Sequence, residues 1–330
     1  MKAGLKEALE QIIDKTSNKT LLELNAIKYL KVLSNDVVDI KIELDDLLNM
    51  DDVKRSIAKV VKLDFSYPGL KIIIEETFKE VEDEVEETSK IKYIAVASGK
   101  GGVGKSTVTA NLAHALSKLG KKVGVIDVDI YGASIPYIFG MEIKPLDLDE
   151  AGKIIPANFN GIDIISTEFF VPKDKPLMWR APIASQMTTM FFNSVSWSDE
   201  IEYVLIDMPP GTGDIAIDVR SLVPLSDMII VTNPNVAAAN IAVKAGLGSK
   251  EIGHNVVGVI ENMSYYYNAC SKEKEYLFGN GGGTLVASKL AVDLLAQIPI
   301  TTPNISDNIY SDLTIEGKTY LFLAQKLISR

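Results

Sequence analysis

Cysteine and histidine are scarce in this sequence. Its 330 residues include one cysteine, Cys270, and two histidines, His114 and His254. A single cysteine excludes an intramolecular disulfide, which is consistent with a reducing cytosol and favours a cytoplasmic location. The two histidines have no metal-ligand spacing, so we expect them to be structural or solvent-facing.

Excess positive charge and long apolar runs are also lacking. With 34 Lys and Arg against 44 Asp and Glu, the net charge is −10. This balance argues against nucleic acid as a partner, because such binding depends on neutralising phosphates. No apolar run approaches the ~18 residues of a membrane helix, so we expect no stable membrane insertion. The amphipathic first ten residues lack the apolar centre of a secretion signal.

The most informative segment is 99–107, which forms a complete P-loop: Gly99, Lys100, Gly101, Gly102, Val103, Gly104, Lys105, Ser106 and Thr107. An apolar strand pattern at 93–97 precedes it and a helix pattern at 108–119 follows, which makes a chance glycine-rich turn the weaker alternative. The loop backbone and the helix N-terminus would surround phosphate oxygens. Lys105 would neutralise the β- and γ-phosphates of ATP, and the Ser106 hydroxyl would ligate Mg2+.

Aspartates at two further strand ends complete the predicted nucleotide site. The strand at 123–127 ends on Asp127, and period-2 alternation places Asp129 on the same side. The strand at 203–207 ends on Asp207 and leads into Met-Pro-Pro-Gly-Thr-Gly-Asp, a fixed pivot with a mobile part that suits a phosphate-sensing switch. Asp207 should hold Mg2+ through water. A solvated pair that merely ends the strand is the alternative for Asp127 and Asp129.

Lys100 is a second lysine inside the loop, and in this the sequence resembles the deviant P-loop ATPases of the MinD/ParA/Mrp class. Residues from about 90 to 330 resemble the Mrp/ApbC branch, the iron–sulfur cluster carriers, through segments in a shared order: 99–107, 127–136, 179–182, 207–214, 261–264, 278–283 and 297–300. The resemblance implies a homodimer in which Lys100 touches the partner's ATP, with iron–sulfur scaffolds or client apoproteins as partners.

The same resemblance implies roles for single residues. Asp129 would orient the hydrolytic water, Asp127 and Asp207 would be the Mg2+-side carboxylates, and Asn262 would contact the adenine edge. The alternative for Asn262 is a turn cap. The protein expected is a Mg2+-dependent ATPase whose catalytic residues are Lys100, Lys105 and Asp129. Its ATP cycle would drive a conformational switch that assembles or transfers iron–sulfur clusters. The alternative is a MinD/ParA-like switch that acts on a protein or surface without a cluster.

The sequence departs from the family pattern at the cluster ligands. The family carries its cluster on a Cys-x-x-Cys shortly after Glu-Asn-Met-Ser, but here those positions fall on Asn268 and Ser271, and Cys270 lies one residue short of the second. A dimer would offer two thiolates, whereas a [4Fe–4S] cluster usually takes four. A bound cluster would therefore need outside ligands such as a small thiol. An ordinary loop cysteine is the alternative.

The chain is expected to hold two domains joined by an acidic linker. Residues 1–80 predict a small α/β domain that resembles the MIP18 type, although an unrelated α/β cap is the alternative, and 81–90 is the linker. Residues 91–330 predict an α/β P-loop ATPase with a mostly parallel sheet and helices on both faces. In the small domain we expect helices at 5–13 and 51–61 and strands at 37–44 and 70–74. In the large domain, further strands are expected at 162–166, 228–232, 256–260 and 296–299.

Overall fold

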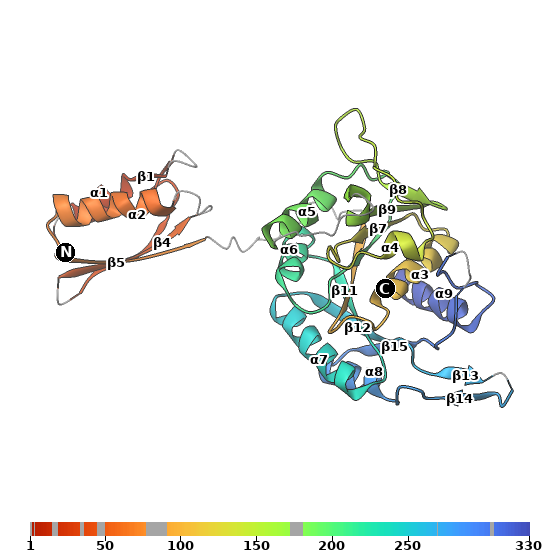
Figure 1. Cartoon of the computed structure of the whole chain (residues 1–330). Helices are drawn as coiled ribbons and strands as arrows, with labels where there is room; N and C mark the ends of the chain where they lie inside the picture. Colours follow the sequence, from red (N-terminus) through yellow and green to blue (C-terminus); the bar gives the residue numbers. More distant parts are fainter. Residues whose placement is uncertain are drawn as a thin grey trace. The chain divides into compact units, whose positions relative to one another are not determined.

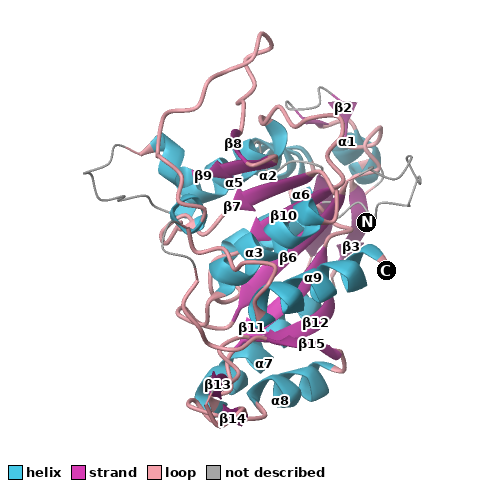
Figure 2. Cartoon of the chain, turned by 90° about the vertical axis from the view of Figure 1, so that its right-hand side faces the viewer, coloured by secondary structure: helices cyan, strands magenta, loops and turns pink. Residues whose placement is uncertain are grey.

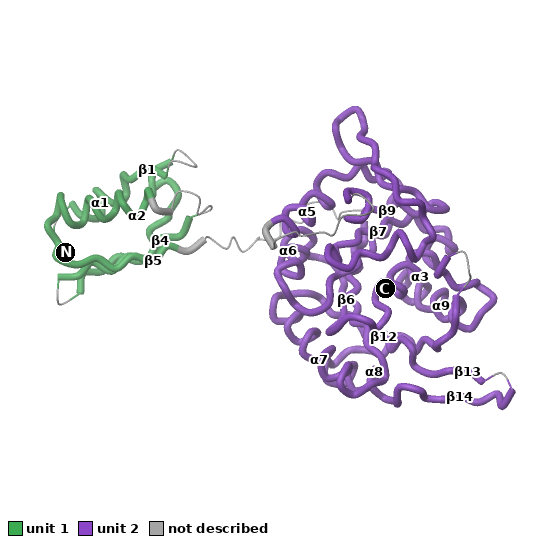
Figure 3. Tube along the Cα trace, viewed as in Figure 1, with its two compact units in different colours: residues 1–88 green, residues 89–330 purple. Residues whose placement is uncertain are grey.

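The computed structural model describes residues 2, 4–14, 19–33, 36–44, 50–76, 91–171, 181–268, 270–303 and 307–330. The chain divides into two compact units, Met1–Thr88 and Ser89–Arg330 (Figure 3). The predicted linker at 81–90 lies outside the described residues. The resemblance of the first unit to the MIP18 type stays a prediction.

The first unit is a small sheet covered by helices (Figure 1). In its three-stranded sheet, β4 is central, antiparallel to β3 and parallel to β5. Alternate residues of β4 are buried, from Val38 to Leu44, and pack with the helices into one core. Its elements are α1 (Leu5–Glu10), β1 (Ile13–Asp14), β2 (Lys19–Thr20), β3 (Ile27–Val32), β4 (Val37–Leu44), α2 (Met50–Lys59), a π-helical turn at Val60–Asp64, and β5 (Gly69–Glu76).

In this unit one predicted helix was too long and one strand was not predicted. The helix expected at 5–13 ends at Glu10, and Ile13 lies in β1 with 54% of its surface exposed, so it does not share the buried face of Leu5 and Leu9. The strand β3 was not predicted, because its burial is uneven and gives no clean alternation.

In the described part of the second unit, eight strands form one sheet in the order β15-β12-β11-β6-β10-β7-β9-β8. All neighbours pair in parallel except β8, which is antiparallel to β9. The strands are β6 (Lys92–Ser98), β7 (Val123–Asp127), β8 (Ala157–Phe159), β9 (Ile162–Ser166), β10 (Tyr203–Asp207), β11 (Asp227–Thr232), β12 (Asn255–Glu261) and β15 (Asp293–Gln297). A mostly parallel α/β sheet confirms the predicted fold class.

Helices cover both faces of this sheet (Figure 2). One core lies between the sheet and α3 with α9, and the other lies between the sheet and α5 to α8. The helices are α3 (Lys105–Lys118), α4 (Ile135–Ile138), α5 (Ala181–Asn193), α6 (Asp214–Leu222), α7 (Val236–Glu251), α8 (Gly282–Leu290) and α9 (Ile315–Ile328), with a 3-10 turn at Thr167–Phe170. No helix in the described ranges is long and apolar enough to span a membrane.

The central strands fall where the sequence predicts them, but the edge strands do not. The strand expected at 296–299 lies at Asp293–Gln297, so only its first two predicted residues fall within the observed strand. The antiparallel edge strand β8 was not predicted. Both are short or half-buried, so they lack the continuous apolar run of the central strands.

Candidate nucleotide-binding site

The loop 99–104 joins the end of the central strand β6 to the start of α3. Gly102 and Gly104 have positive φ angles of 79° and 81°, a conformation that favours glycine. A Cβ on Gly104 would lie 2.1 Å from the amide nitrogen of Asn262, and one on Gly99 would lie 2.6 Å from the backbone nitrogen of Ala242. Backbone conformation therefore favours glycine at 102 and 104, and close packing requires it at 99 and 104.

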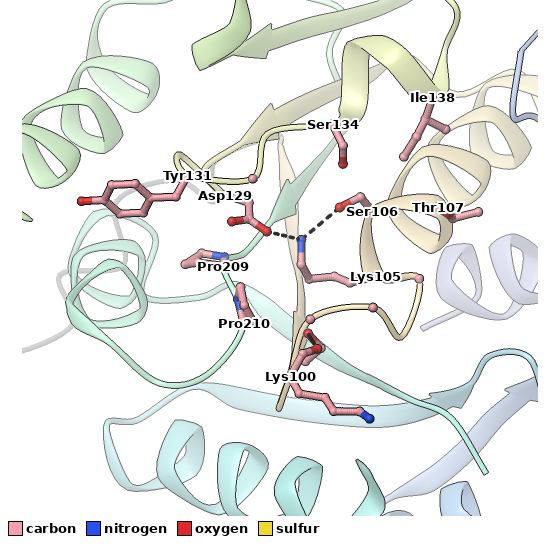
Figure 4. A pocket seen from close by; sticks show the side chains of 15 residues that line it. Lys100, Lys105, Ser106, Thr107, Asp129, Tyr131, Ser134, Ile138, Pro209 and Pro210 are labelled. Atoms are coloured by element: carbon pink, nitrogen blue, oxygen red, sulfur yellow. Dashed lines mark hydrogen bonds and ion pairs between the residues drawn. The ribbon is translucent and has the colours of Figure 1, made fainter. Parts of the chain in front are cut away.

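A cavity of about 760 Å³ opens at this loop (Figure 4). Its walls are the P-loop, the first residues of α3, the segment from Asp129 to Ser134, and the Pro209-Pro210 pair. The volume is in the range of small-molecule and cofactor sites. The cavity lies at the carboxyl ends of parallel strands, which is where open α/β sheets bind ligands.

Lys105 lies at the centre of a buried charge cluster. Its Nζ donates to Asp207 Oδ2 at 2.7 Å and to Ser106 Oγ at 3.1 Å, and lies 3.3 Å from Asp129 Oδ2. Burial lowers the pKa of Lys105, but attraction to Asp207 and Asp129 outweighs it and the net pKa is raised. Burial raises the pKa of Asp129, against the opposing effect of Lys105. The structure brings together three of the predicted site residues around this lysine.

The Asp207 carboxylate is fully buried and is held on both oxygens. Ser106 Oγ donates to Oδ2 at 2.6 Å, and Thr109 Oγ1 donates to Oδ1 at 2.7 Å. Thr109 was missed by the sequence reasoning. Its spacing of four residues from Lys105 places it on the same helix face, which is the pattern that could have identified it.

Asp127 lies beside this cluster but does not line the cavity. Its Oδ2 accepts hydrogen bonds from the backbone N–H groups of Ser134 at 3.1 Å and Ile135 at 3.2 Å, and from Ser166 Oγ at 3.1 Å. Burial, followed by the charge of Asp207, raises the pKa of Asp127 to about 7. Its carboxylate therefore holds the loop after β7, and its role beside Mg2+ stays a prediction.

Asn262 is buried beneath the P-loop. Its side-chain nitrogen donates to the Val103 carbonyl at 2.9 Å, and its backbone N–H donates to the Thr232 carbonyl at 2.8 Å. Asn262 thus ties the turn after β12 to the P-loop. Contact with adenine stays a prediction for this residue.

Lys100 also lines the cavity, but it lies away from the Lys105 cluster. In Figure 4 its side chain points away from Lys105 and Asp129. Contact with a partner's ATP stays a prediction for this residue.

Cys270 lies away from the cavity, between β13 (Tyr266–Asn268) and β14 (Glu273–Glu275). It is exposed, and its backbone N–H donates to Asn268 Oδ1 at 2.9 Å. No group of three or more His, Cys, Asp or Glu side chains in the described part of the chain could hold a metal ion. Trp179 and Arg180, from the family segment at 179–182, lie outside the described residues.

The fold and the site define a P-loop nucleotide hydrolase with a MinD/ParA-like sheet. A family model described as ParA, NUBPL iron-transfer P-loop NTPase matches residues 90–317, and the chain belongs to this family. The iron-sulfur cluster carrier protein of Bacillus subtilis (strain 168) is 44% identical over 240 residues, which cover 71% of this chain and 67% of that protein. The protein of the same name from Mycobacterium leprae (strain TN) is 32% identical, covering 91% and 84%.

Solved structures agree with this fold. A nucleotide-binding protein in complex with ADP from Archaeoglobus fulgidus has 34% identity and a TM-score of 0.54, covering 71% of this chain and 88% of that one. The cell division ATPase MinD of Pyrococcus furiosus, at 23% identity and a TM-score of 0.50, covers 72% and 98% and shares the fold. The predicted family and P-loop NTPase architecture are confirmed.

Proposed function

We propose that this protein hydrolyses ATP with Mg2+ and uses the cycle as a conformational switch in the assembly or transfer of iron–sulfur clusters. The observation that carries the proposal is the group formed by Lys105, Ser106, Asp129 and the buried Asp207 beside a cavity lined by the P-loop glycines. The names of the Bacillus and Mycobacterium relatives support the iron–sulfur part.

The oxygen atoms beside the P-loop suit Mg2+. Ser106 Oγ and Asp207 Oδ2 lie 2.6 Å apart at the start of α3, and Asp127 is the second carboxylate proposed for this ion. Mg2+ typically takes one or two carboxylates and completes its shell with waters and substrate phosphates, so a small protein ligand set fits. When bound, the ion would offset the negative charge of the phosphates.

Three residues of this chain would have separate roles in hydrolysis. Lys105 would exchange its carboxylate partners for phosphate oxygens, since a triphosphate offers more negative charge. Asp129 lies 3.3 Å from Lys105 Nζ and would orient the attacking water. Its raised pKa makes it a better proton acceptor than an ordinary aspartate. Lys100 would meet the transferring phosphoryl group of the partner's ATP in a homodimer.

The cluster is cargo in this proposal, and the chain supplies few ligands for it. Cys270 gives two thiolates in a dimer, so the other ligands of a [4Fe–4S] cluster would come from a small thiol or from a scaffold or client apoprotein in the cytoplasm. The same shortage favours a second candidate function. In that alternative, the protein is a MinD/ParA-like switch that acts on a protein or surface without carrying a cluster.

Anaerobic reconstitution tests the proposal. Wild type, Cys270→Ser and the neighbouring control Ser271→Ala are incubated with iron, sulfide and glutathione, and visible absorbance and iron per dimer are measured. We expect about four irons per dimer in wild type and in Ser271→Ala, and loss of the cluster in Cys270→Ser. A wild type that binds no cluster would favour the alternative. A Cys270→Ser variant that keeps the cluster would show that Cys270 is not its ligand.

A further inference from the structure

The carboxylate of Glu261 is buried at the end of β12, with 1% of the residue exposed. Its Oε1 accepts hydrogen bonds from Ser264 Oγ at 2.6 Å and Gln297 Nε2 at 2.8 Å, and its Oε2 accepts one from the backbone N–H of Gly283. All three donors are neutral. Burying a carboxylate is costly unless its oxygens are hydrogen-bonded, so this set of donors is what makes the position tenable.

Glycines allow the N-terminus of α8 to reach this carboxylate. Gly283 is the second residue of the helix, and a Cβ there would lie 2.6 Å from the Glu261 Cβ and 3.0 Å from its Oε2. A Cβ on Gly282 would lie 2.7 Å from the Asn233 carbonyl oxygen. The helix N-terminus carries partial positive charge, which favours a carboxylate at this point.

Three segments that are distant in sequence therefore meet at Glu261. They are 261–264, 278–283 and 297–300, and the hydrolysis chemistry described above uses none of their contacts to this carboxylate. Backbone hydrogen bonds strengthen the junction: Ile298 N donates to Glu261 O at 2.9 Å, and Ser264 N donates to Ile298 O at 2.8 Å. The turn at 261–264 is thus fixed by side-chain and backbone contacts together.

This turn has a functional element on each side. Asn262 holds the Val103 carbonyl of the P-loop at 2.9 Å. On the other side, the chain enters the β13–β14 hairpin that carries Cys270. Tyr265 contacts that hairpin, because the Nζ of Lys274 in β14 lies 4.1 Å from the centre of its ring. The turn at 261–264 therefore connects Asn262, which contacts the P-loop, to the β13–β14 hairpin along the chain.

We propose that Glu261 is a positioning residue that joins the nucleotide site to the Cys270 hairpin. Its carboxylate fixes the 261–264 turn, so a displacement of the P-loop is passed through Asn262 to the start of the hairpin. Glu261 does not line the cavity and is not a catalytic residue. The inference rests on ATP binding at the P-loop, as proposed above, and is independent of whether Cys270 binds a cluster.

The test uses Glu261→Gln, which keeps the side-chain shape but replaces one acceptor oxygen with a donor that faces Gly283 N–H or the Ser264 and Gln297 donors. Glu251→Gln, an exposed change at the end of α7, is the matched control. ATP hydrolysis gives KM and kcat. Cys270 is the only thiol, so its alkylation rate with iodoacetamide, measured with and without ATP, reports on the hairpin alone.

We expect Glu261→Gln to raise KM for ATP about tenfold while kcat changes by less than about twofold, because a lost hydrogen bond to a charged group weakens ground-state positioning. In wild type and Glu251→Gln, ATP should change the alkylation rate of Cys270, and in Glu261→Gln this ATP dependence should be lost. Ser264→Ala removes one donor and should give a smaller change in the same direction.

Wild-type KM and ATP-dependent alkylation in a folded Glu261→Gln would overturn the inference, as would alkylation of wild type that does not respond to ATP. If Glu261→Gln does not fold, Ser264→Ala is used in its place. A raised KM for ATP together with a weaker ATP dependence of Cys270 alkylation would support the inference. Failure to see both changes would overturn it. A wild type that fails to bind ATP at all would instead contradict the proposed function.

Discussion

At the scale of single residues, the site shows how a buried lysine is kept charged. Lys105 is 6% exposed, and the oxygens of Asp207 and Asp129 lie 2.7 and 3.3 Å from its amine. Two carboxylates around one lysine leave the local charge negative, which suits a site that receives Mg2+ together with a polyphosphate. Lys105 therefore offsets only part of the negative charge of these two carboxylates.

Asp129→Ala should separate ATP binding from hydrolysis. We expect hydrolysis to fall by about 10²–10⁴-fold, the usual contribution of a positioned proton acceptor, while ATP still binds. The uncleaved ATP should hold the protein as a dimer, seen by light scattering. Lys105→Ala should lose ATP binding itself, and Asp199→Ala, an exposed change, should behave as wild type. Unchanged hydrolysis in folded Asp129→Ala would exclude Asp129 as the water-orienting group.

The sequence predicts which residues gather around the P-loop better than how their side chains are oriented. Asp127 and Asp129 were expected on one side because strand residues alternate. However, β7 ends at Asp127, so Asp129 lies in the following loop and faces the cavity, while Asp127 binds backbone N–H groups of that loop. The contacts of Thr109 and Asn262 depend on tertiary distances, which no local pattern contains.

At the scale of elements, the strands that are buried along their whole length were predicted at the right positions, and the partly exposed edge strands β8 and β15 were not. All residues of β7 and β10 are buried, and both strands lie at the predicted positions because a strand buried on both faces needs an unbroken apolar run. The edge strand β15 is only half-buried and its position was displaced. The helix α1 likewise ends at Glu10, whose carbonyl accepts a hydrogen bond from the Leu22 N–H at 3.0 Å, three residues before its apolar pattern stops.

His254 links two elements and predicts a pH effect. It is 4% exposed, and its Nε2 lies 2.8 Å from the Ala216 carbonyl of α6. Burial lowers its pKa below 6.5, the hydrogen bond to Ala216 opposes this, and the charge of Arg220 lowers it further. Below about pH 6.5 the unfolded chain therefore takes up a proton that the folded one resists, so the stability contribution present above that pH is lost on acidification.

The prediction is a difference between wild type and His254→Gln. As pH falls from about 8 to about 5, the free energy of unfolding of wild type should decrease more than that of the variant, because only wild type gains the extra proton on unfolding. Urea titrations at a series of pH values measure this. Parallel pH profiles for the two proteins would show that His254 does not titrate differently in the folded state.

At the scale of the whole molecule, each compact unit has a hydrophobic core of its own. The core of Met1–Thr88 gathers residues from Leu5 to Tyr67, whereas both cores of Ser89–Arg330 are built from residues of that unit alone. Every described residue of the nucleotide cavity belongs to the second unit. A unit that supplies its own core can in principle fold alone.

Removal of residues 1–88 should therefore leave a folded ATPase. We expect the remaining chain to bind and hydrolyse ATP within about twofold of full-length protein. Its melting temperature should lie within a few degrees of that of the second unit in full-length protein, because no core contact of this unit is lost. Calorimetry and steady-state kinetics measure both. Lys105→Ala in the shortened chain is the control that ties turnover to the P-loop. An insoluble or ATP-free product would show that the first unit is needed to complete the fold of the second.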